Sequence, residues 1–486
     1  MQHIWSITGR SLAVSTLALA LAACQSMRGP EPVAKSDIPS DYASQHNAGK
    51  SIAEQGYKDF FADQRLTQVI DLALNNNRDL RTAILNIQKA QAQYRITQNN
   101  RLPTLDGTGS FTRQNNQFQF GEYKPISIYS ATVGITSYEL DFWGRLKSLK
   151  DAALDNYLGL QSTRDATQIS LISQVSEAWL SYSYANASLK LAEDTLRTQL
   201  DAYKLNKKRF DVGIDSEVPL RQAQISVETA RADVGNYKTQ VAQARNALNL
   251  LVGQPVSESL LPKETVTKIS NETVFATGLS SDLLYNRPDI QQSAYALSAA
   301  GANIGAAKAQ LFPTISLTST AGYGSTDLSS LFRSGSFVWS FAPSLNLPIF
   351  DWGTRKANIK ISKVEQEIAL STYEKTIQTA FKEVSDALAT RENLDERLQA
   401  QRALVKATNR TYDLSSARYR AGIDGYLTVL NSQKDAYAAE QSLLALQLIA
   451  LNNQIELYKT LGGGVKAYTA DQTYHQQSSL EKHYQK

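Results

Sequence analysis

The sequence predicts a mainly α-helical protein with a small β part, built from two tandem repeats of long antiparallel coiled-coil helices. Three observations lead to this fold class. Short phrases recur about 209 residues later, long stretches without proline carry apolar residues at heptad spacing, and shorter stretches alternate apolar with small or polar residues. Each repeat is expected to contain a helix, then two strands, then a helical hairpin.

The recurring phrases hold a nearly constant spacing along the chain. RFDVGID begins at Arg209, and its counterpart RYRAGID begins at Arg418, 209 residues later. Further pairs at a spacing of 209 or 210 are Val175-Ser176-Glu177-Ala178 with Val384-Ser385-Asp386-Ala387, Trp143-Gly144 with Trp352-Gly353, and Leu102-Pro103-Thr104 with Phe312-Pro313-Thr314. Such constancy indicates a tandem duplication. We therefore divide the sequence into repeat 1 at residues 65–274 and repeat 2 at residues 275–465.

The amino terminus has the features of a secreted, lipid-anchored protein. Arg10 precedes an apolar run, so residues 1–23 are interpreted as a signal peptide. The run ends in LAAC, which resembles the lipobox of bacterial lipoproteins, and Cys24 is the expected site of acylation. The alternative is a buried cysteine near an ordinary cleavage site. Residues 24–64, rich in Pro, Gly and Ser, are expected to form a lipidated extended arm, and residues 466–486 a polar tail.

Each repeat opens with a predicted helix, at about residues 66–100 and 279–311, followed by two predicted strands. In repeat 2, Phe337, Trp339 and Phe341 alternate with small or polar residues, and repeat 1 shows the same pattern around Val133. Strands that are apolar on one face are typical of a transmembrane barrel, with a soluble-domain sheet as the alternative. Four strands cannot close a barrel, so a membrane sheet would need several copies, giving 8 or 12 strands.

Two long helical hairpins complete the repeats. Residues 144–211 contain no proline, and apolar residues follow one another every seven positions from Val175 to Phe210. The two GID phrases are interpreted as the turns at the hairpin tips. Gly213 and Gly422 are expected to end the first helix of each hairpin in the left-handed conformation, and Asp215 and Asp424 to cap the next helix.

The composition argues against an enzyme. His3, His46, His475 and His483 all lie outside the repeats, which also contain no cysteine. A zinc site, a Ser-His-Asp triad or a Cys-His pair therefore cannot be built there, and we expect no catalytic residue, no metal site and no cofactor. The net charge of +4 mixes both signs, so nucleic acid is not an expected partner.

The whole pattern resembles the outer membrane factors, the TolC-like exit ducts of Gram-negative bacteria. The motifs that carry this resemblance are NRPDI at 286–290, LPIFDWGTRKANI at 347–359, RYRAGIDGYLTVLNSQ at 418–433 and LYKTLGGG at 457–464. With the lipobox, they are similar to the lipoprotein (NodT-type) branch that serves resistance-nodulation-division (RND) efflux pumps. The resemblance implies a homotrimer with a 12-stranded barrel in the outer membrane and a helical barrel in the periplasm. Implied partners are outer membrane lipid, a periplasmic adaptor (membrane fusion) protein and an inner membrane RND transporter.

The resemblance also implies functional residues at the hairpin tips. The periplasmic gate would comprise Tyr419, Arg420, Asp424, Leu427, Asn431 and Lys434. Leu427 would form an apolar ring, while Asn431 stands where the family commonly has aspartate, so a charged ring is in doubt there. The alternative is a coiled-coil core position at Leu427 and solvated positions at Asn431 and Lys434. Adaptor docking would use Gly213, Ile214, Asp215, Ser216, Gly422, Ile423, Asp424 and Gly425.

The expected function is passive export of drugs and other small molecules through a gated duct. Two alternatives stay open at this point. One is the exit duct of a protein secretion system. The other is a lipid-anchored scaffold that spans the periplasm as a coiled coil, which leaves the alternating strands without a purpose.

Overall fold

The computed structural model describes residues 27–29, 32–35, 38–39, 55–117, 123–271 and 281–464. Cys24, the predicted signal peptide and the predicted tail lie outside these residues. The described chain is mainly helical and contains one four-stranded antiparallel sheet, which confirms the predicted fold class. Among its helices, none combines the length and the apolar character needed to cross a bilayer.

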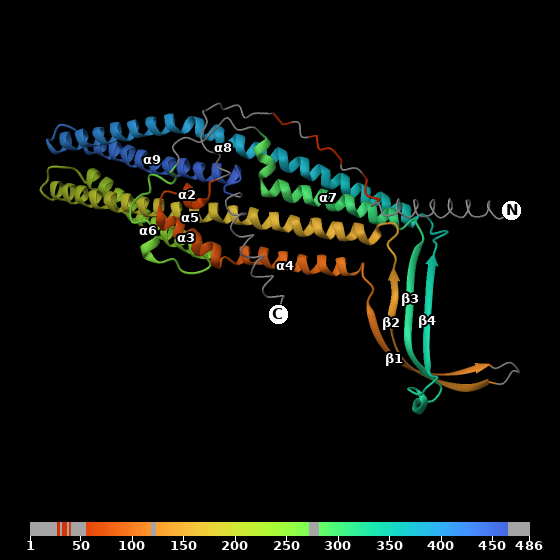
Figure 1. Cartoon of the computed structure of the whole chain (residues 1–486). Coiled ribbons are helices and arrows are strands. Elements are labelled where there is room, and N and C mark those ends of the chain that lie inside the picture. The colour runs from red at the N-terminus through yellow and green to blue at the C-terminus, as the bar shows by residue number, and fades with distance from the viewer. Residues whose placement is uncertain are drawn as a thin grey trace. The chain divides into compact units, whose positions relative to one another are not determined.

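The elements follow one another in the order shown in Figure 1. The first half of the chain contains α2 (Tyr57–Phe60), α3 (Gln64–Asn76), α4 (Arg78–Asn99), β1 (Leu105–Gln117), β2 (Tyr123–Glu139), α5 (Arg145–Asp211), α6 (Glu217–Val252) and the 3₁₀ helix η2 (Glu258–Leu260). The second half contains η3 (Ser281–Asn286), α7 (Pro288–Ala309), β3 (Thr314–Ser325), η4 (Leu328–Ser330), β4 (Phe337–Asn346), α8 (Thr354–Arg420) and α9 (Tyr426–Thr460). The predicted strand pairs and helical hairpins are thus present in both halves.

The described residues group into two compact units, and each takes segments from both halves of the sequence. One unit comprises Asn86–Gln161 and Gln292–Glu374 with the described residues up to Lys35, and it contains the sheet. The other comprises the described parts of Ser36–Leu85, Ser162–Gln291 and Lys375–Lys486, and it contains the turns of both helical hairpins.

The sheet has the order β1-β2-β3-β4, and its register separates two kinds of side chain. Val133 of β2 lies opposite Gly107 of β1 and Ala321 of β3, and Ala321 lies opposite Trp339 of β4. Directly opposed residues share a face, so this row and the alternate rows form the apolar face. The other face is polar, with hydroxyl contacts of 2.7 Å between Ser110 and Ser130, Thr320 and Ser340, and Ser316 and Ser344.

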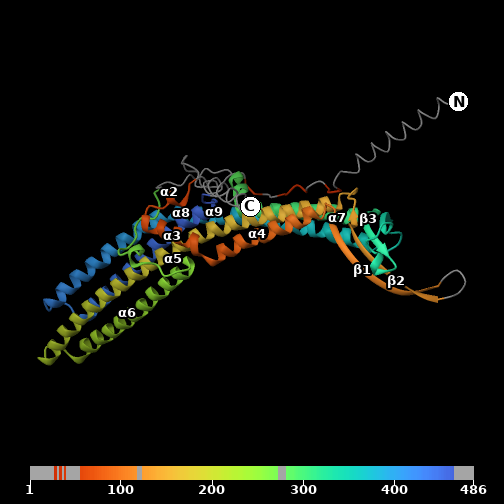
Figure 2. The same cartoon turned by 60° about the horizontal axis from the view of Figure 1, so that its bottom comes forward.

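The apolar face of the sheet is uncovered within one copy of the chain. All ten residues of β4 are exposed, and Trp339 exposes 72% of its surface. β1 and β4 form the two edges of the sheet. In Figure 2, β1 and β2 continue beyond β3 and β4 as a two-stranded ribbon, because β2 pairs with β3 only from Tyr129 onward. A sheet of this kind needs further partners for both its face and its edges.

Two glycines let the central strands approach each other. A Cβ at Gly134 would lie 2.2 Å from the carbonyl oxygen of Ser319, and a Cβ at Gly322 would lie 2.2 Å from the carbonyl oxygen of Ala131. Both distances are far inside van der Waals contact, so neither position accepts a side chain without movement of the backbone. The β2–β3 junction, where the two halves of the sequence meet, therefore requires glycine on both strands.

The prediction of one unbroken helix at the start of each repeat is wrong. In repeat 1 the helix breaks at Asn77, whose Oδ1 accepts the backbone N–H groups of Asp79 and Leu80, each at 2.9 Å, and thereby caps α4. In repeat 2 the break precedes Pro288, which is the first residue of α7. Proline is favoured there because the first helical N–H has no partner within the helix.

The segment that follows α6 covers one side of α5 in the helical unit. Trp179 is fully buried, and its Nε1 donates to the carbonyl of Leu260 at 3.0 Å. The hydroxyl of Tyr184 donates to the carbonyl of Val266 at 2.9 Å, and burial raises the pKa of Tyr184 to about 12. The hydroxyl therefore stays protonated at neutral pH. Heptad spacing did not predict this contact, since the segment has no periodic signal.

Asn77→Ala is expected to destabilise the helical unit by about 1 to 3 kcal/mol. The change removes the α4 cap and also leaves the carbonyl of Leu251 without the amide of Asn77, which donates to it at 2.8 Å. Circular dichroism during thermal unfolding in detergent measures the effect. Asn75→Ala is the matched control, because the exposed Asn75 amide only bonds back to its own helix at Asp71. Equal midpoints for the two variants would contradict the capping role.

Candidate functional site

The two hairpin turns have the same backbone geometry. Gly213 has a φ of 77° and Gly422 has a φ of 76°, both in the left-handed region. The N–H of Ile214 donates to the carbonyl of Arg209 at 2.8 Å, and the N–H of Ile423 donates to that of Arg418 at 3.0 Å. These bonds satisfy carbonyls at the helix ends in the manner of a glycine-terminated helix, so the predicted role of both glycines is confirmed.

The predicted role of the two aspartates as helix caps is wrong. The capping positions are Ser216 and Gly425, and neither makes a side-chain cap. Asp215 instead accepts from Arg209, with Nε at 2.6 Å, and Asp424 accepts from Arg418, also with Nε at 2.6 Å. Each pair spans the turn from the last helical residues to the loop. The repeated spacing of six residues between Arg and Asp thus encodes an ionic clamp across the turn.

The clamp shifts the titration of both carboxyls. The hydrogen bond from Arg209 lowers the pKa of Asp215, and the hydrogen bond from Arg418 lowers the pKa of Asp424, below the ordinary value near 3.8. Both carboxyls are therefore ionised at neutral pH. They keep accepting from the guanidinium groups under the conditions in which the protein works.

Tyr419 joins the second hairpin to the first. It is 6% exposed, its hydroxyl donates to Oδ1 of Asn206 at 2.8 Å, and the same oxygen lies 3.4 Å from Oδ2 of Asp215. The guanidinium of Arg209 lies over its ring, 5.2 Å from the centroid. Burial, and then the charge of Asp215, raises the pKa of Tyr419, so the hydroxyl remains a donor. The clamp of the first hairpin and the tyrosine of the second therefore form one polar cluster.

Tyr426 lies beneath this cluster and had no assigned role in the sequence analysis. Its ring centroid is 5.5 Å from that of Tyr419, and it packs with Ala223, Val429 and Leu430. It is 3% exposed, and burial raises its pKa to about 12. Its hydroxyl has no hydrogen-bond partner among the described residues. Adjacent side chains of a helix point in different directions. Tyr426 precedes the exposed Leu427 by one residue, so its burial could have been predicted.

The remaining predicted gate residues lie on the surface of a single copy. Arg420 is exposed, and its Nε donates to the carbonyl of Ser416 in its own helix at 3.3 Å. Leu427, Asn431 and Lys434 are spaced by four and three residues along α9, so they share one helix face, and all three are exposed. Leu427 exposes 54% of its surface. Their role toward the pore stays a prediction.

The predicted docking residues are also accessible. Gly213, Ile214 and Ser216 are exposed at the first tip, as are Gly422, Ile423 and Gly425 at the second. The two isoleucines expose 64% and 62% of their surfaces. The two aspartates differ, because they are half-buried in their clamps. The tips therefore present apolar side chains on turns whose backbone is held by ion pairs.

Two further polar contacts link α6 to α9. The hydroxyl of Tyr437 donates to Oδ2 of Asp233 at 3.3 Å, and the amide of Gln441 donates to the hydroxyl of Tyr237 at 2.9 Å. Burial, followed by the charge of Asp233, raises the pKa of both tyrosines. A groove of about 770 Å³ lies alongside and is lined from α5, α6 and α9. The polar side chains at these positions of α6 and α9 are the sequence signal from which the contacts could have been predicted.

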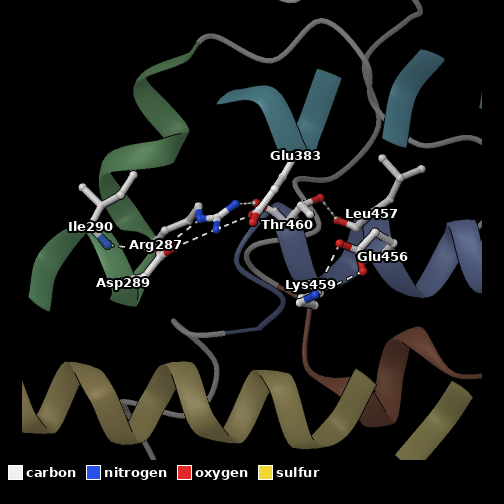
Figure 3. A network of polar contacts seen from close by, with 8 residues as sticks. All are labelled: Arg287, Asp289, Ile290, Glu383, Glu456, Leu457, Lys459 and Thr460. Atoms are coloured by element: carbon white, nitrogen blue, oxygen red, sulfur yellow. Dashed lines mark hydrogen bonds and ion pairs between the residues drawn. The ribbon is translucent and has the colours of Figure 1, made fainter. Parts of the chain in front are cut away.

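Two of the motifs that carried the family resemblance meet in one polar network around the buried Arg287 (Figure 3). Arg287, 9% exposed, donates to both oxygens of Asp289 at 3.1 and 2.7 Å and to Oε2 of Glu383 at 2.8 Å. Its Nη1 donates to the carbonyl of Thr460 at 3.0 Å, at the end of α9. Burial lowers the pKa of Arg287, but its two carboxylate partners outweigh burial, and the pKa is raised. Arg287 thus connects the start of α7 with α8 and with the end of α9.

Within the described residues, no cluster of three or more His, Cys, Asp or Glu side chains is placed to hold a metal ion.

The fold is that of an outer membrane channel subunit. The structure of the open state of the MtrE outer membrane channel of Neisseria gonorrhoeae superimposes with a TM-score of 0.83 and is 38% identical, covering 91% of this chain and 99% of that one. Residues 69–254 and 279–463 match the family described as outer membrane efflux protein, and the chain belongs to that family. It is therefore an outer membrane protein of a channel family and not of an enzyme family.

Two curated relatives show how far the similarity extends. The antibiotic efflux pump outer membrane protein ArpC of Pseudomonas putida is 41% identical over 483 residues, which is 98% of this chain and 99% of ArpC. The cation efflux system protein CusC of Escherichia coli K12 is 40% identical over 420 residues, which is 86% of this chain and 91% of CusC. The chain thus spans nearly the full length of both relatives.

The clamps predict a pH dependence that is confined to the tips. A lowered folded-state pKa stabilises the turn at every pH above the unfolded value near 3.8, and this contribution is lost as the pH falls below it. The double variant D215N/D424N is therefore expected to show weaker protection of residues 209–220 and 418–430 against amide hydrogen exchange at pH 7. The difference from the unchanged protein should decrease steadily as the pH is lowered below 3.8, after correction for intrinsic exchange rates.

Asp201→Asn provides the control for that experiment. Asp201 pairs with Lys204 at 3.1 Å on an exposed helix surface, where a salt bridge contributes little. Its replacement should leave protection of the tips unchanged at every pH tested. A D215N/D424N effect that does not decrease as the pH is lowered below 3.8 would show that the substitutions act through packing and not through loss of the carboxylate charge.

Proposed function

We propose that the protein is the outer membrane exit duct of a tripartite efflux pump of the RND type. Drugs and other small molecules would leave through it passively, since the chain offers no nucleotide-binding loop and the duct only conducts. The observation that carries the proposal is the sheet, which leaves one apolar face and two edges uncovered in a chain that belongs to an outer membrane efflux family. A bilayer covers such a face, and further copies complete such edges.

The open edges of the sheet require more than one copy, and the family resemblance favours three. In lipid, each unpaired backbone N–H or C=O costs several kcal/mol, so β1 and β4 must pair with other copies. Three copies supply a 12-stranded barrel in the outer membrane, and their hairpins supply a helical barrel in the periplasm. The repeats at residues 65–274 and 275–465 then contribute two similar wall segments per copy. A homotrimer is accordingly the proposed state.

The remaining partners are a periplasmic adaptor and an inner membrane RND transporter. ArpC is named for antibiotic efflux and CusC for cation efflux, although this chain is similarly related to both. Chemically distant cargoes in similar ducts favour selection of the cargo by the inner membrane transporter. The exposed tips, Gly213–Ser216 and Gly422–Gly425, are the proposed docking surface for the adaptor.

The periplasmic gate is proposed to be an apolar ring of Leu427 from three copies, supported by the exposure of this side chain on the face it shares with Asn431 and Lys434. An amide at position 431 adds no charge to the ring. Tyr419 would restrain the second hairpin through its bond to Asn206, so opening would require that this buried contact be broken or carried along.

Purified, lipidated protein should behave as a trimer in native mass spectrometry and give small, rarely open steps in planar bilayers. Leu427→Ala or Leu427→Gly should raise the closed-state conductance, because the apolar constriction is widened. Leu404→Ala, which shortens an exposed leucine on α8, serves as the control. An unchanged closed-state conductance would remove Leu427 from the gate. A monomer or dimer without conductance would favour the coiled-coil scaffold.

Lipidation of Cys24, the residue that would follow a cleaved signal peptide at 1–23, is proposed as a second membrane attachment. Cys24→Ala is expected to abolish labelling with palmitate. It should reduce barrel assembly without eliminating it, because the strands themselves anchor the protein in the bilayer. Labelling in cells and the fraction of oligomer in outer membranes measure the two effects. Gln25→Ala keeps the cysteine and should label normally. Palmitate on the Cys24→Ala protein would overturn the assignment.

A further inference from the structure

Two tryptophans at equivalent positions of the two repeats have opposite surroundings. Trp143 follows β2 and is half-buried, whereas Trp352, its counterpart 209 residues later, follows β4 and exposes 89% of its surface. Both tryptophans precede a glycine with positive φ, Gly144 and Gly353. The local sequence is repeated, but among the described residues the contact made by its aromatic side chain is made only at Trp143.

Trp143 holds the end of repeat 1 against the start of repeat 2. Its ring stacks on Phe312 with the centroids 4.7 Å apart, and its Nε1 donates to the carbonyl of Pro313 at 2.8 Å. Next to it, the N–H of Leu140 donates to the carbonyl of Ile315 at 2.9 Å and continues the pairing of β2 with β3. An aromatic lock therefore closes the junction between two neighbouring strand pairs.

Every participant in this lock has a repeat counterpart that is exposed. Trp352 corresponds to Trp143, and Ile349, which corresponds to Leu140, exposes 90% of its surface. At the opposite edge of the sheet, Leu102 corresponds to Phe312 and exposes 62%, and Pro103, which corresponds to Pro313, is exposed as well. One half of the lock is therefore exposed at β4, where the ring of Trp352 packs edge-on against Phe350 with the centroids 4.7 Å apart, and the other half is exposed at β1.

We propose that Trp352 of one copy docks on Leu102 and Pro103 of the next copy and repeats the lock between chains. The inference rests on the proposed function, because it needs copies arranged in a ring. In the docked state, Nε1 of Trp352 donates to the carbonyl of Pro103. The N–H of Ile349 donates to the carbonyl of Leu105, which corresponds to Ile315. This assigns the register in which β4 of one copy pairs with β1 of the next.

Hydrogen bonds to Asp351 order the backbone that follows Trp352. Asp351 accepts the N–H groups of Gly353 and Arg355, each at 3.0 Å, and so fixes the start of α8. Trp352 itself has a φ of 56°, a left-handed conformation that a bulky residue rarely adopts. Trp352 presents a large apolar ring that carries an N–H donor. On a second copy, Leu102 and Pro103 offer an apolar surface with a carbonyl acceptor, which suits such a ring.

A cysteine pair tests the assigned register. Antiparallel residues in this arrangement have Cα atoms about 5.5 Å apart, within reach of a disulfide. The I349C/L105C variant of the full chain, oxidised in detergent and separated after heat denaturation without reductant, should give linked dimers and trimers. The matched control L140C/I315C occupies the equivalent positions inside one chain and should run as a single copy. Each single-cysteine variant should give no ladder.

Three outcomes separate the two levels of inference. A ladder from the I349C/L105C pair alone supports the lock between copies. A trimer by native mass spectrometry without any ladder overturns the lock and leaves the proposed duct intact. A monomer overturns both.

A second measurement tests the tryptophan itself. Trp352→Ala should lower the temperature at which trimers dissociate in detergent, while Trp352→Phe, which keeps a ring but loses the N–H, should have a smaller effect. Trp339→Ala removes another exposed tryptophan, on the apolar face of β4, and should leave that temperature unchanged. Equal dissociation temperatures for Trp352→Ala and the unchanged trimer would overturn the lock, as would quenching of the Trp352 fluorescence by brominated lipid, which would place the ring in the bilayer.

Discussion

The backbone hydrogen bonds at the two edges of the sheet are the constraint on which the rest of the structure depends. A four-stranded sheet with one apolar face and no covering layer is unstable in water, because the face is exposed, and unstable in lipid as a single copy, because its edges are unpaired. In the proposed function, a membrane covers this face and further copies complete the edges. A helical hairpin follows each strand pair along the chain, so the closure that sets the number of strands in the proposed duct also sets the number of its helices.

The hairpin tips show how a duplicated sequence acquires unequal parts. Both turns carry the clamp between Arg and Asp, yet Tyr419 of the second repeat corresponds to Phe210 of the first, which has no hydroxyl and is exposed. The bond from Tyr419 to Asn206 therefore ties the tip of the second hairpin to the first, and Phe210 offers no such bond in return. Tyr437 and Gln441 link α9 to α6 further from the tip, so loss of the Tyr419 bond would release only the tip region, whose clamped turn keeps its shape.

Much of the fold could be predicted from the sequence because its signals are local. The proline-free stretch at 144–211 matches α5 at Arg145–Asp211, and the glycine turns lie where they were predicted, because each of these signals is contained in a short stretch of sequence. Contacts between distant segments could not be predicted in this way. Arg287 donates to the carbonyl of Thr460, 173 residues away in the sequence. Trp179 donates to the carbonyl of Leu260, which lies in a segment without periodicity. The aspartates of the GID phrases were misassigned because a cap and a clamp use the same residue type, and only geometry distinguishes them.

The exposed apolar residues at the ends of the sheet acquire a meaning once the duplication is considered. In a tandem repeat, a junction between consecutive units is made inside the chain wherever one unit follows another. The same groups must remain unpaired at the first and last units. A chain of two units makes one junction and leaves one donor half and one acceptor half, which are complementary to each other. Such a chain avoids open edges by closing on its own copies, and closure with identical junctions requires that the contacts between copies match those within one copy. In this arrangement, the half-buried Trp143 makes within one copy the contact that the exposed Trp352 makes between copies.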